Sequence, residues 1–200
     1  MKLYYSPGAS SLATHISLRE ADLPFEMERV DLREKKTESG KDFYQVNPKG
    51  AVPALQLDNG EVLTEGCAVL QYVADLAPEK KLAPAAGSMA RYRLMEWLNL
   101  IATELHKNFS PFFNKAMLDP CKEVFKGNLN RYLAVVEKQL SSTSFLMGDT
   151  FTVADAYLFT VSRYCRFAGV DMDKYPSLQA FQQRVAARET VKEALKFEGL

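Results

Sequence analysis

A change of pattern near residue 80 most constrains what this chain can fold into. Before it, short strand-like runs alternate with helical runs, whereas the residues after it carry almost only helical periodicity. The stretch between, residues 77–87, contains prolines and a glycine, which interrupt helices and strands alike. The sequence therefore predicts two domains: residues 1–80 with mixed α/β structure, and residues 87–200 with helices only.

The first domain is predicted to be a small sheet covered by helices. Strand-like runs at residues 3–5 and 25–30 flank a helical run that ends at about Ala21. Two further runs, residues 54–57 and 61–63, flank Asp58-Asn59-Gly60, where Asn-Gly favours a type I′ hairpin turn. A helix near Glu65 follows. The order βαβ and then ββα predicts a mixed sheet with helices packed on it.

The second domain has its clearest helix over residues 90–107. Apolar side chains recur there on one side of the helix, at Leu94, Trp97, Leu98, Ile101 and Leu105. Further along, Thr152 and Asp155 have the spacing of a capping box at the start of another helix.

Charge and cysteine content argue against several classes of function. Twenty-five Lys and Arg balance 25 Asp and Glu, so no net charge attracts nucleic acids or anionic membranes. The three cysteines form no Cys-x-x-Cys pair, which disfavours a disulfide framework and a zinc site. A strand-like run stands at the start in place of a leader, and no apolar run approaches the ~20 residues that span a bilayer. We expect a cytoplasmic protein with no metal site, no nucleic-acid partner and no membrane anchor.

The turn from Ser6 to Ser11 is the first candidate site. A helix start offers free N–H groups and the positive end of the helix dipole, which stabilise an anion such as a thiolate. Ser10 and Ser11 are equally good N-cap residues. From the residues alone, this turn is either an anion-binding site or a simple helix cap.

Two further candidates lie in the second half of the first domain. A cis bond at Val52-Pro53 would turn the main chain of Val52 outwards to pair with an extended ligand, whereas most X-Pro bonds are trans. Glu65-Gly66 places an acid at a helix start, where it can bind an ammonium group or simply complement the helix dipole. Cys67 beside them has apolar neighbours and is expected to be a small buried hydrophobe.

The helical domain carries a polar stripe and an aromatic cluster. At helical spacing, Asn99, Thr103 and His106, extended by Lys107, fall along one face, which is either solvated or functional. The aromatic residues line an apolar pocket or belong to the core; they are Phe109, Phe112, Phe113, Tyr157, Tyr164 and Phe167.

Taken together and in this order, the motifs resemble the cytosolic glutathione transferases over essentially the whole chain, most closely the bacterial beta class. The resemblance rests on residues 3–12 (LYYSPGASSL), 35–40 (KKTESG), 47–50 (NPKG), 52–55 (VPAL), 63–66 (LTEG) and 104–107 (ELHK). It implies a thioredoxin-like N-terminal domain, an all-helical C-terminal domain, glutathione as co-substrate, a homodimer and a role in detoxification.

Carried over residue by residue, the resemblance implies a complete site. Val52, held by cis Pro53, would pair with the cysteinyl unit of glutathione, while Glu65 and Gly66 would hold its γ-glutamyl end. Lys35 and Lys107 would be cationic contacts, Asn99 and Thr103 would lie on the helix that reaches the site, and His106 would lie near the sulfur. The substrate pocket would contain Phe109, Phe112, Phe113, Tyr164 and Phe167.

One residue departs from the beta-class pattern, which has cysteine where this chain has Ser10. An alcohol does not enter thiol–disulfide exchange, but it can donate a hydrogen bond to a glutathione thiolate. Ser11 is an alternative donor. We therefore expect a transferase that ionises glutathione for attack on a small apolar electrophile. The alternative is a protein that binds glutathione or an apolar ligand without turnover.

Overall fold

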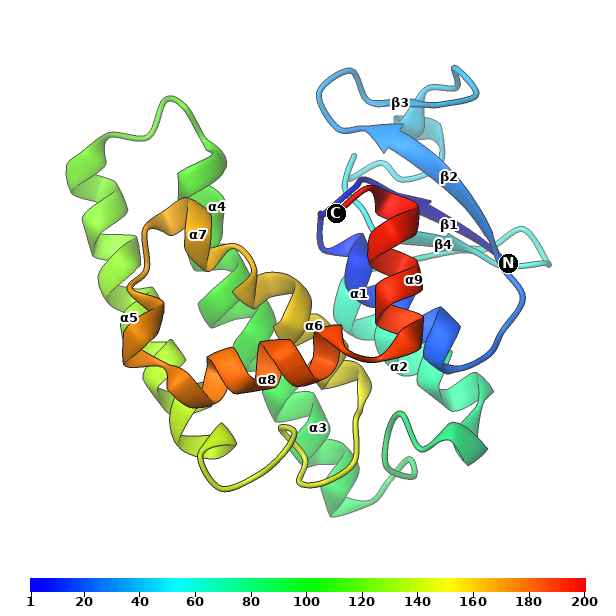
Figure 1. Ribbon diagram of the computed structural model, residues 1–200. Helices are drawn as coiled ribbons and strands as arrows, with labels where there is room; N and C mark the ends of the chain where they lie inside the picture. The colour runs from blue at the N-terminus through cyan, green and yellow to red at the C-terminus, as the bar shows by residue number, and fades with distance from the viewer. The chain divides into compact units, whose positions relative to one another are not determined.

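The computed structural model describes residues 1–200, which form two compact units. One unit contains residues 1–83 and 188–200, and the other contains residues 84–187. The break at residues 83–84 falls inside the predicted linker, but the last residues differ from the predicted helical domain. They belong to the first unit because α9 (Glu189–Glu198) packs against α1 (Ser11–Glu20), as Figure 1 shows.

The first unit is built on the predicted mixed sheet. Its five strands are arranged in the order β3-β2-β1-β4-β5, with β1 and β2 parallel and the other neighbours antiparallel. Their bounds are β1 Lys2–Tyr5, β2 Glu26–Asp31, β3 Lys36–Thr37, β4 Ala54–Gln56 and β5 Val62–Thr64. The helices α1 and α2 (Gly66–Leu76) pack on each other, and short 3-10 turns lie at Phe43–Gln45 and Pro78–Lys80.

The β4–β5 hairpin differs from the predicted type I′ turn. That turn needs positive φ at both Asn59 and Gly60, but only Gly60 has it, at +90°. Leu57 and Glu61 pair across the hairpin, and the Gly60 N–H donates to the Leu57 carbonyl. The loop is therefore one residue longer than a two-residue turn, and a glycine after a tight turn closes it.

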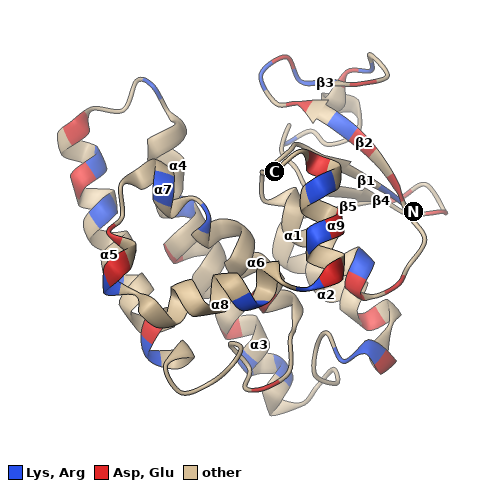
Figure 2. Cartoon of the chain, in the orientation of Figure 1, with Lys and Arg blue, Asp and Glu red and all other residues tan.

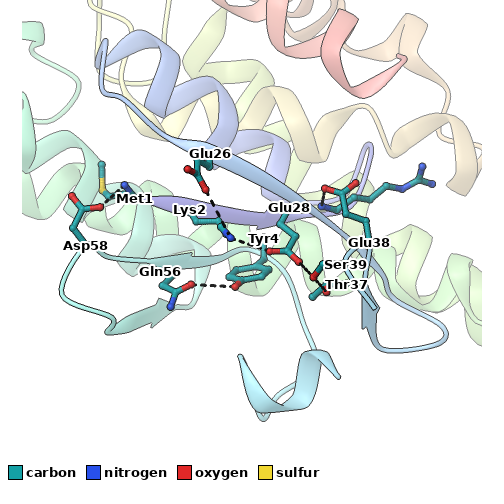
Figure 3. A network of polar contacts seen from close by, with 11 residues as sticks. Met1, Lys2, Tyr4, Glu26, Glu28, Thr37, Glu38, Ser39, Gln56 and Asp58 are labelled. Carbon is teal, nitrogen blue, oxygen red and sulfur yellow. Dashed lines mark hydrogen bonds and ion pairs between the residues drawn. The ribbon is translucent and has the colours of Figure 1, made fainter. Parts of the chain in front are cut away.

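Side chains of β1, β2 and β4 form a polar network on one face of the sheet (Figure 3). The Lys2 ammonium lies 3.2 Å from Glu28, and the Ser39 hydroxyl donates to the same carboxylate at 2.5 Å. Burial acts to raise the pKa of Glu28, but hydrogen bonds from Ser39, Thr37 and Lys2 outweigh it and lower the pKa. The buried carboxylate is therefore satisfied within the sheet, and this network is structural.

The second unit is helical throughout. Its helices are α3 Met89–Leu100, α4 Lys107–Phe113, α5 Asp119–Leu140, α6 Val153–Ser162, α7 Cys165–Ala168 and α8 Pro176–Ala186, with a 3-10 turn at Met172–Lys174. The predicted helix over residues 90–107 is interrupted, because residues Ile101–His106 form a π-helix in which the Lys107 N–H donates to the Ala102 carbonyl. Such segments often occur at functional sites.

The predicted capping box at the start of α6 is confirmed. The buried Asp155 carboxylate accepts hydrogen bonds from the Leu146 N–H and from the N–H and hydroxyl of Thr152, each at 2.8 Å. Burial raises the pKa of Asp155 to about 6, against the opposing effect of these donors. The box fixes the start of α6, the helix that carries Tyr157.

Charges of both signs are interspersed along the chain. Figure 2 shows Lys and Arg alternating with Asp and Glu along α5 and α9. None of the helices has the combination of length and apolarity that a membrane crossing requires.

Candidate active site

Ser10 lies at the start of α1, but its side chain does not cap the helix. It has helical φ and ψ, and its hydroxyl donates to the Val52 carbonyl at 3.1 Å. The backbone N–H groups of Ser10 and Ser11 make no hydrogen bond within the chain. The helix start therefore presents a hydroxyl and two N–H donors beside the loop that contains Val52, which favours the anion-site interpretation over the helix cap.

Ser11 has a different role from its neighbour. It is fully buried, and its hydroxyl accepts from the Ser6 N–H at 3.2 Å and donates to the Ser6 carbonyl at 3.3 Å. These bonds close the turn before the helix. Ser11 is thus buried within the turn, whereas Ser10 is partly exposed and makes a single hydrogen bond, so Ser10 is the hydroxyl that a ligand can reach.

A buried pair between α1 and α9 supports the same turn. The Glu198 carboxylate accepts from the Gly8 N–H at 2.9 Å and lies 2.9 Å from Nδ1 of His15, with both side chains fully buried. Arg19 donates to Nε2 of His15, so the proton of the neutral ring is on Nδ1 and points at Glu198. The C-terminal helix therefore anchors the turn that precedes Ser10.

The bond between Val52 and Pro53 is cis, as the functional interpretation of this loop requires. Val52 and Pro53 are both buried, and no hydrogen bond within the chain uses the Val52 N–H. The Val52 carbonyl, in contrast, accepts from Ser10. This leaves one main-chain donor of Val52 for a ligand.

Glu65 has the most unusual backbone of the site. Its φ of 69° and ψ of 111° lie outside the conformations common for a residue with a side chain, and such strain clusters at binding sites. The carboxylate does not cap α2; it is exposed and lies 2.6 Å from Nζ of Lys49. At Gly66 a Cβ would meet only Pro53 at 4.0 Å, so no packing within the chain demands glycine there.

Lys35 and Gly50 join two loops near Val52. The Lys35 ammonium donates to the Gly50 carbonyl at 2.7 Å. Gly50 has φ of +61°, and a Cβ there would lie 2.7 Å from a ring carbon of Tyr44, so only glycine fits. Lys35 thus borders the loop that carries Val52-Pro53.

The π-helix changes the predicted polar stripe. Asn99, Thr103 and Lys107 are exposed, and the Thr103 hydroxyl donates to the Asn99 carbonyl at 3.0 Å. His106 is half-buried and turns away from them, with Nδ1 2.9 Å from the hydroxyl of Tyr157. A π turn holds more residues than an α turn, so the 3.6-residue spacing behind the predicted stripe does not apply here, and His106 is less exposed than the other three residues.

The aromatic residues form one connected cluster around Tyr164. Its ring contacts His106, Phe109 and Phe113 at centroid distances of 6.0, 5.9 and 5.4 Å, and Phe113 contacts Phe167 at 5.4 Å. Phe113 and Phe167 are about half exposed, at 53% and 51%, whereas Phe109 is fully buried. Phe109 is therefore a core residue beneath the cluster and not part of a pocket surface.

Phe112 lies in the same helix as Phe109 and Phe113 and is half-buried.

Cys67, next to Gly66, is only partly exposed. Burial and the neighbouring Glu65 raise the pKa of its thiol to about 11. The thiol is therefore protonated at neutral pH, in agreement with its predicted structural role.

Sequence reasoning missed Lys49, Tyr157 as a partner of His106, and the pair His15–Glu198. Lys49 is part of the NPKG motif, but its Nζ reaches Glu65 across 16 positions of sequence. Tyr157 is 51 positions from His106, and Glu198 is 183 from His15. No local pattern signals such pairs.

An α/β unit, in which a helix start lies beside a cis-proline loop, and a helical unit together have the architecture that the sequence resemblance implies. Two family models match the chain: "Glutathione S-transferase, N-terminal domain" over residues 1–75 and "Glutathione S-transferase, C-terminal domain" over residues 103–198. The glutathione S-transferase GstA of Escherichia coli O157:H7 is 46% identical, with both chains covered in full.

Solved structures agree with the family models. A sphingomonad glutathione S-transferase complexed with glutathione is 47% identical with a TM-score of 0.96, and the beta-class enzyme of Sphingomonas chungbukensis is 45% identical with a TM-score of 0.96. Each alignment covers both chains in full. The chain belongs to the glutathione S-transferase family, a class of enzymes whose co-substrate is glutathione, and the resemblance inferred from the sequence is confirmed.

Proposed function

We propose that this protein binds glutathione in its first unit and ionises the thiol with Ser10, for attack on a small apolar electrophile. The observation that carries the proposal is the hydrogen bond of 3.1 Å from Ser10 to the Val52 carbonyl. It places the Ser10 hydroxyl beside the main-chain group that would pair with the cysteinyl unit. A thiol held by Val52 would therefore meet Ser10 and the N–H groups of the helix start.

The residues of the first unit that we propose as contacts of glutathione match its main-chain and charged groups. The Val52 N–H pairs with the cysteinyl main chain, and the exposed Glu65 carboxylate binds the γ-glutamyl ammonium. Gly66 leaves room for that end of the ligand. Lys35, whose ammonium borders the same loop, binds a carboxylate of glutathione. Each assignment matches the charge of the group it receives.

From the helical unit we propose Asn99, Thr103 and Lys107 as further polar contacts of glutathione and His106 as a group acting at the reacting atoms. The electrophile binds on the exposed part of the aromatic cluster. Phe113 and Phe167 supply its surface, Phe112 and Tyr164 its flank, and Phe109 supports it from the core. Such a surface selects for apolarity and flatness.

Calorimetry with glutathione tests the proposed site through Glu65→Ala. Removing the charged acceptor of the ligand ammonium should weaken the binding free energy by about 1.5–3 kcal/mol, so the Kd should rise about 10- to 150-fold. Glu61→Ala is the matched control, because Glu61 is also exposed and its carboxylate accepts a hydrogen bond only from the Asn59 side chain. Unchanged affinity in Glu65→Ala would refute the assigned site, and absence of binding in the unsubstituted protein would refute the function.

Lys49→Met is expected to tighten glutathione binding. Lys49 occupies the Glu65 carboxylate in the unliganded protein and competes with the incoming ammonium. Exposed ion pairs contribute about 0.2–1 kcal/mol, so removing this competitor should lower the Kd by about 1.5- to 5-fold. Lys41→Met, which removes another exposed lysine of the first unit, controls for the loss of one positive charge. Weaker binding in Lys49→Met would mean that Lys49 contacts the ligand instead.

We further propose a homodimer in the cytoplasm. Met89 and Tyr92, three positions apart on α3, are exposed at 69% and 53%, so they lie on one side of the helix where a second copy of the chain can cover them. Sedimentation equilibrium should give twice the chain mass of 22.5 kDa. Substituting both residues by serine should shift the protein toward the monomer.

A further inference from the structure

The contact between His106 and Tyr157 is the polar feature of the aromatic cluster that the proposed function leaves without a role. Nδ1 of His106 lies 2.9 Å from the Tyr157 hydroxyl, and the two rings meet edge to face at 90° with centroids 5.9 Å apart. Tyr157 is 4% exposed and belongs to α6, whose start is fixed by the capping box. The hydroxyl is therefore held by a rigid helix and not by a loop.

The chemistry of the two groups sets the direction of this hydrogen bond. Burial, together with the neighbouring Lys107 ammonium, lowers the pKa of His106, so its ring is neutral at pH 7 and carries a single N–H. A phenol, with a pKa of ~10, is a strong donor, and the bare nitrogen of a neutral imidazole is a strong acceptor. These strengths favour the Tyr157 hydroxyl as the donor to Nδ1, an arrangement that leaves the ring proton on Nε2.

No group of the chain forms a hydrogen bond with Nε2 of His106. The same ring contacts Tyr164, which leads to the exposed rings of Phe113 and Phe167. Nε2 is therefore the ring nitrogen of His106 that remains for a ligand, on a ring that is part of the aromatic cluster.

We infer that Tyr157 is a positioning residue that holds His106 as the Nε2–H tautomer, so that His106 acts as a hydrogen-bond donor and not as a base. This inference rests on the proposed function and names the substrate class of the site: flat apolar electrophiles with an acceptor oxygen conjugated to the reacting carbon. When the thiolate forms its bond to the β-carbon of an enone, the π electrons move to the carbonyl oxygen. Nε2–H donates to that oxygen and keeps its proton, and water later protonates the α-carbon.

The chain offers an internal reference for the tautomer. It has only two histidines, and in His15 the acceptor is Nε2, which receives the hydrogen bond from Arg19, while Nδ1–H faces Glu198. His15 and His106 are thus expected to be opposite tautomers within one molecule. Two-bond proton–nitrogen NMR spectra of protein labelled with 15N-histidine distinguish the two patterns without any ligand.

The test compares unsubstituted protein with Tyr157→Phe. We expect the Nε2–H pattern at His106 in the former, and in Tyr157→Phe a shift of the two nitrogen signals toward each other as both tautomers become populated. Tyr175→Phe, which removes a hydroxyl that bonds to Asn130 in the same unit, should leave the His106 signals unchanged. An Nδ1–H pattern in the unsubstituted protein overturns the inference, and so does an unchanged His106 in Tyr157→Phe.

Kinetics give an independent readout of the same variant. With an aryl enone and glutathione, Tyr157→Phe should lower kcat about 2- to 12-fold, the worth of one hydrogen bond, while the Kd for glutathione stays within about twofold. Unchanged kcat overturns the donor role. The NMR spectrum of the unsubstituted protein needs neither substrate nor variant, so the inference can be tested even if Tyr157→Phe is unstable. Failure of the protein to bind glutathione would refute the proposed function but not the tautomer of His106.

Discussion

Ser10→Ala is expected to lower kcat/KM for glutathione conjugation at pH 7 by about 10- to 30-fold, the range that the loss of thiolate at this pH allows. A free thiol with a pKa of ~8.5 is only a few per cent ionised at pH 7, and lowering that pKa by ~2 units requires ~2.7 kcal/mol of preference for the thiolate. The charge-assisted hydrogen bond from Ser10 is the largest single contribution to that preference, at about 1.5–3 kcal/mol.

The hydrogen bond from Ser10 to the Val52 carbonyl reduces the net stabilisation that Ser10 can give to the thiolate. Ser10 has one hydroxyl proton, which it donates to the Val52 carbonyl, so it must rotate away from that carbonyl to reach the sulfur. The lost bond is worth about 0.5–1.5 kcal/mol, which the N–H groups of Ser10 and Ser11 and the helix dipole, at about 0.3–1 kcal/mol, must offset. The thiolate is therefore stabilised jointly by the hydroxyl and the helix start.

The pH profile distinguishes this role from a structural one. The thiolate is the reactive form, so kcat/KM rises as the pH passes the pKa of the bound thiol. In Ser10→Ala the rising limb should move upward toward ~8.5, and the rate at high pH should largely recover. A uniform loss at every pH, with no shift of the limb, would show that Ser10 does not stabilise the thiolate.

Ser10→Cys is the companion variant. If the surrounding geometry suits a beta-class thiol, this change should create thiol–disulfide exchange activity that the serine enzyme lacks. An enzyme whose conjugation rate is negligible with either residue would favour the alternative of glutathione binding without turnover.

Glu198→Ala is expected to lower the thermal midpoint by about 6–24 °C. The Glu198 side chain is fully buried and accepts hydrogen bonds from the Gly8 N–H and from His15, and the substitution removes both. Hydrogen bonds to a charged group contribute about 1.5–3 kcal/mol each, so losing the two costs about 3–6 kcal/mol. For a chain of this length each kcal/mol shifts the midpoint by about 2–4 °C.

Glu193→Ala is the matched control in the same helix. Glu193 pairs with Arg19 at 2.7 Å, but its side chain is 62% exposed. Exposed pairs contribute about 0–1 kcal/mol, so its midpoint should fall by no more than about 4 °C. Equal shifts in the two variants, measured by differential scanning calorimetry, would contradict the buried anchor between α1 and α9.

The elements that the sequence predicted well are those that local chemistry determines. Thr152 and Asp155 form the predicted capping box, the mixed sheet has the expected strands, and the apolar side of residues 90–107 is mostly buried. Family resemblance added the cis Val52-Pro53 bond, which base rates alone would not favour.

The errors arose where distant contacts override local pattern. The place of α9 in the first unit depends on His15 and Glu198, which are 183 positions apart. The π-helix at residues 101–106 does not follow the 3.6-residue spacing behind the predicted polar stripe, in which His106 is less exposed than the other three residues. The same aromatic spacing serves core and surface, so only burial separates Phe109 from Phe113.

The central claim is that Ser10 stabilises the thiolate of bound glutathione, and the distance from the glutathione sulfur to Ser10 Oγ tests it most directly. In a crystal structure of the complex, the account predicts a sulfur–oxygen distance of about 3.0–3.4 Å, with the Ser10 hydroxyl turned from the Val52 carbonyl toward the sulfur. A sulfur beyond hydrogen-bond reach, with Ser10 still bonded to the Val52 carbonyl, would contradict it.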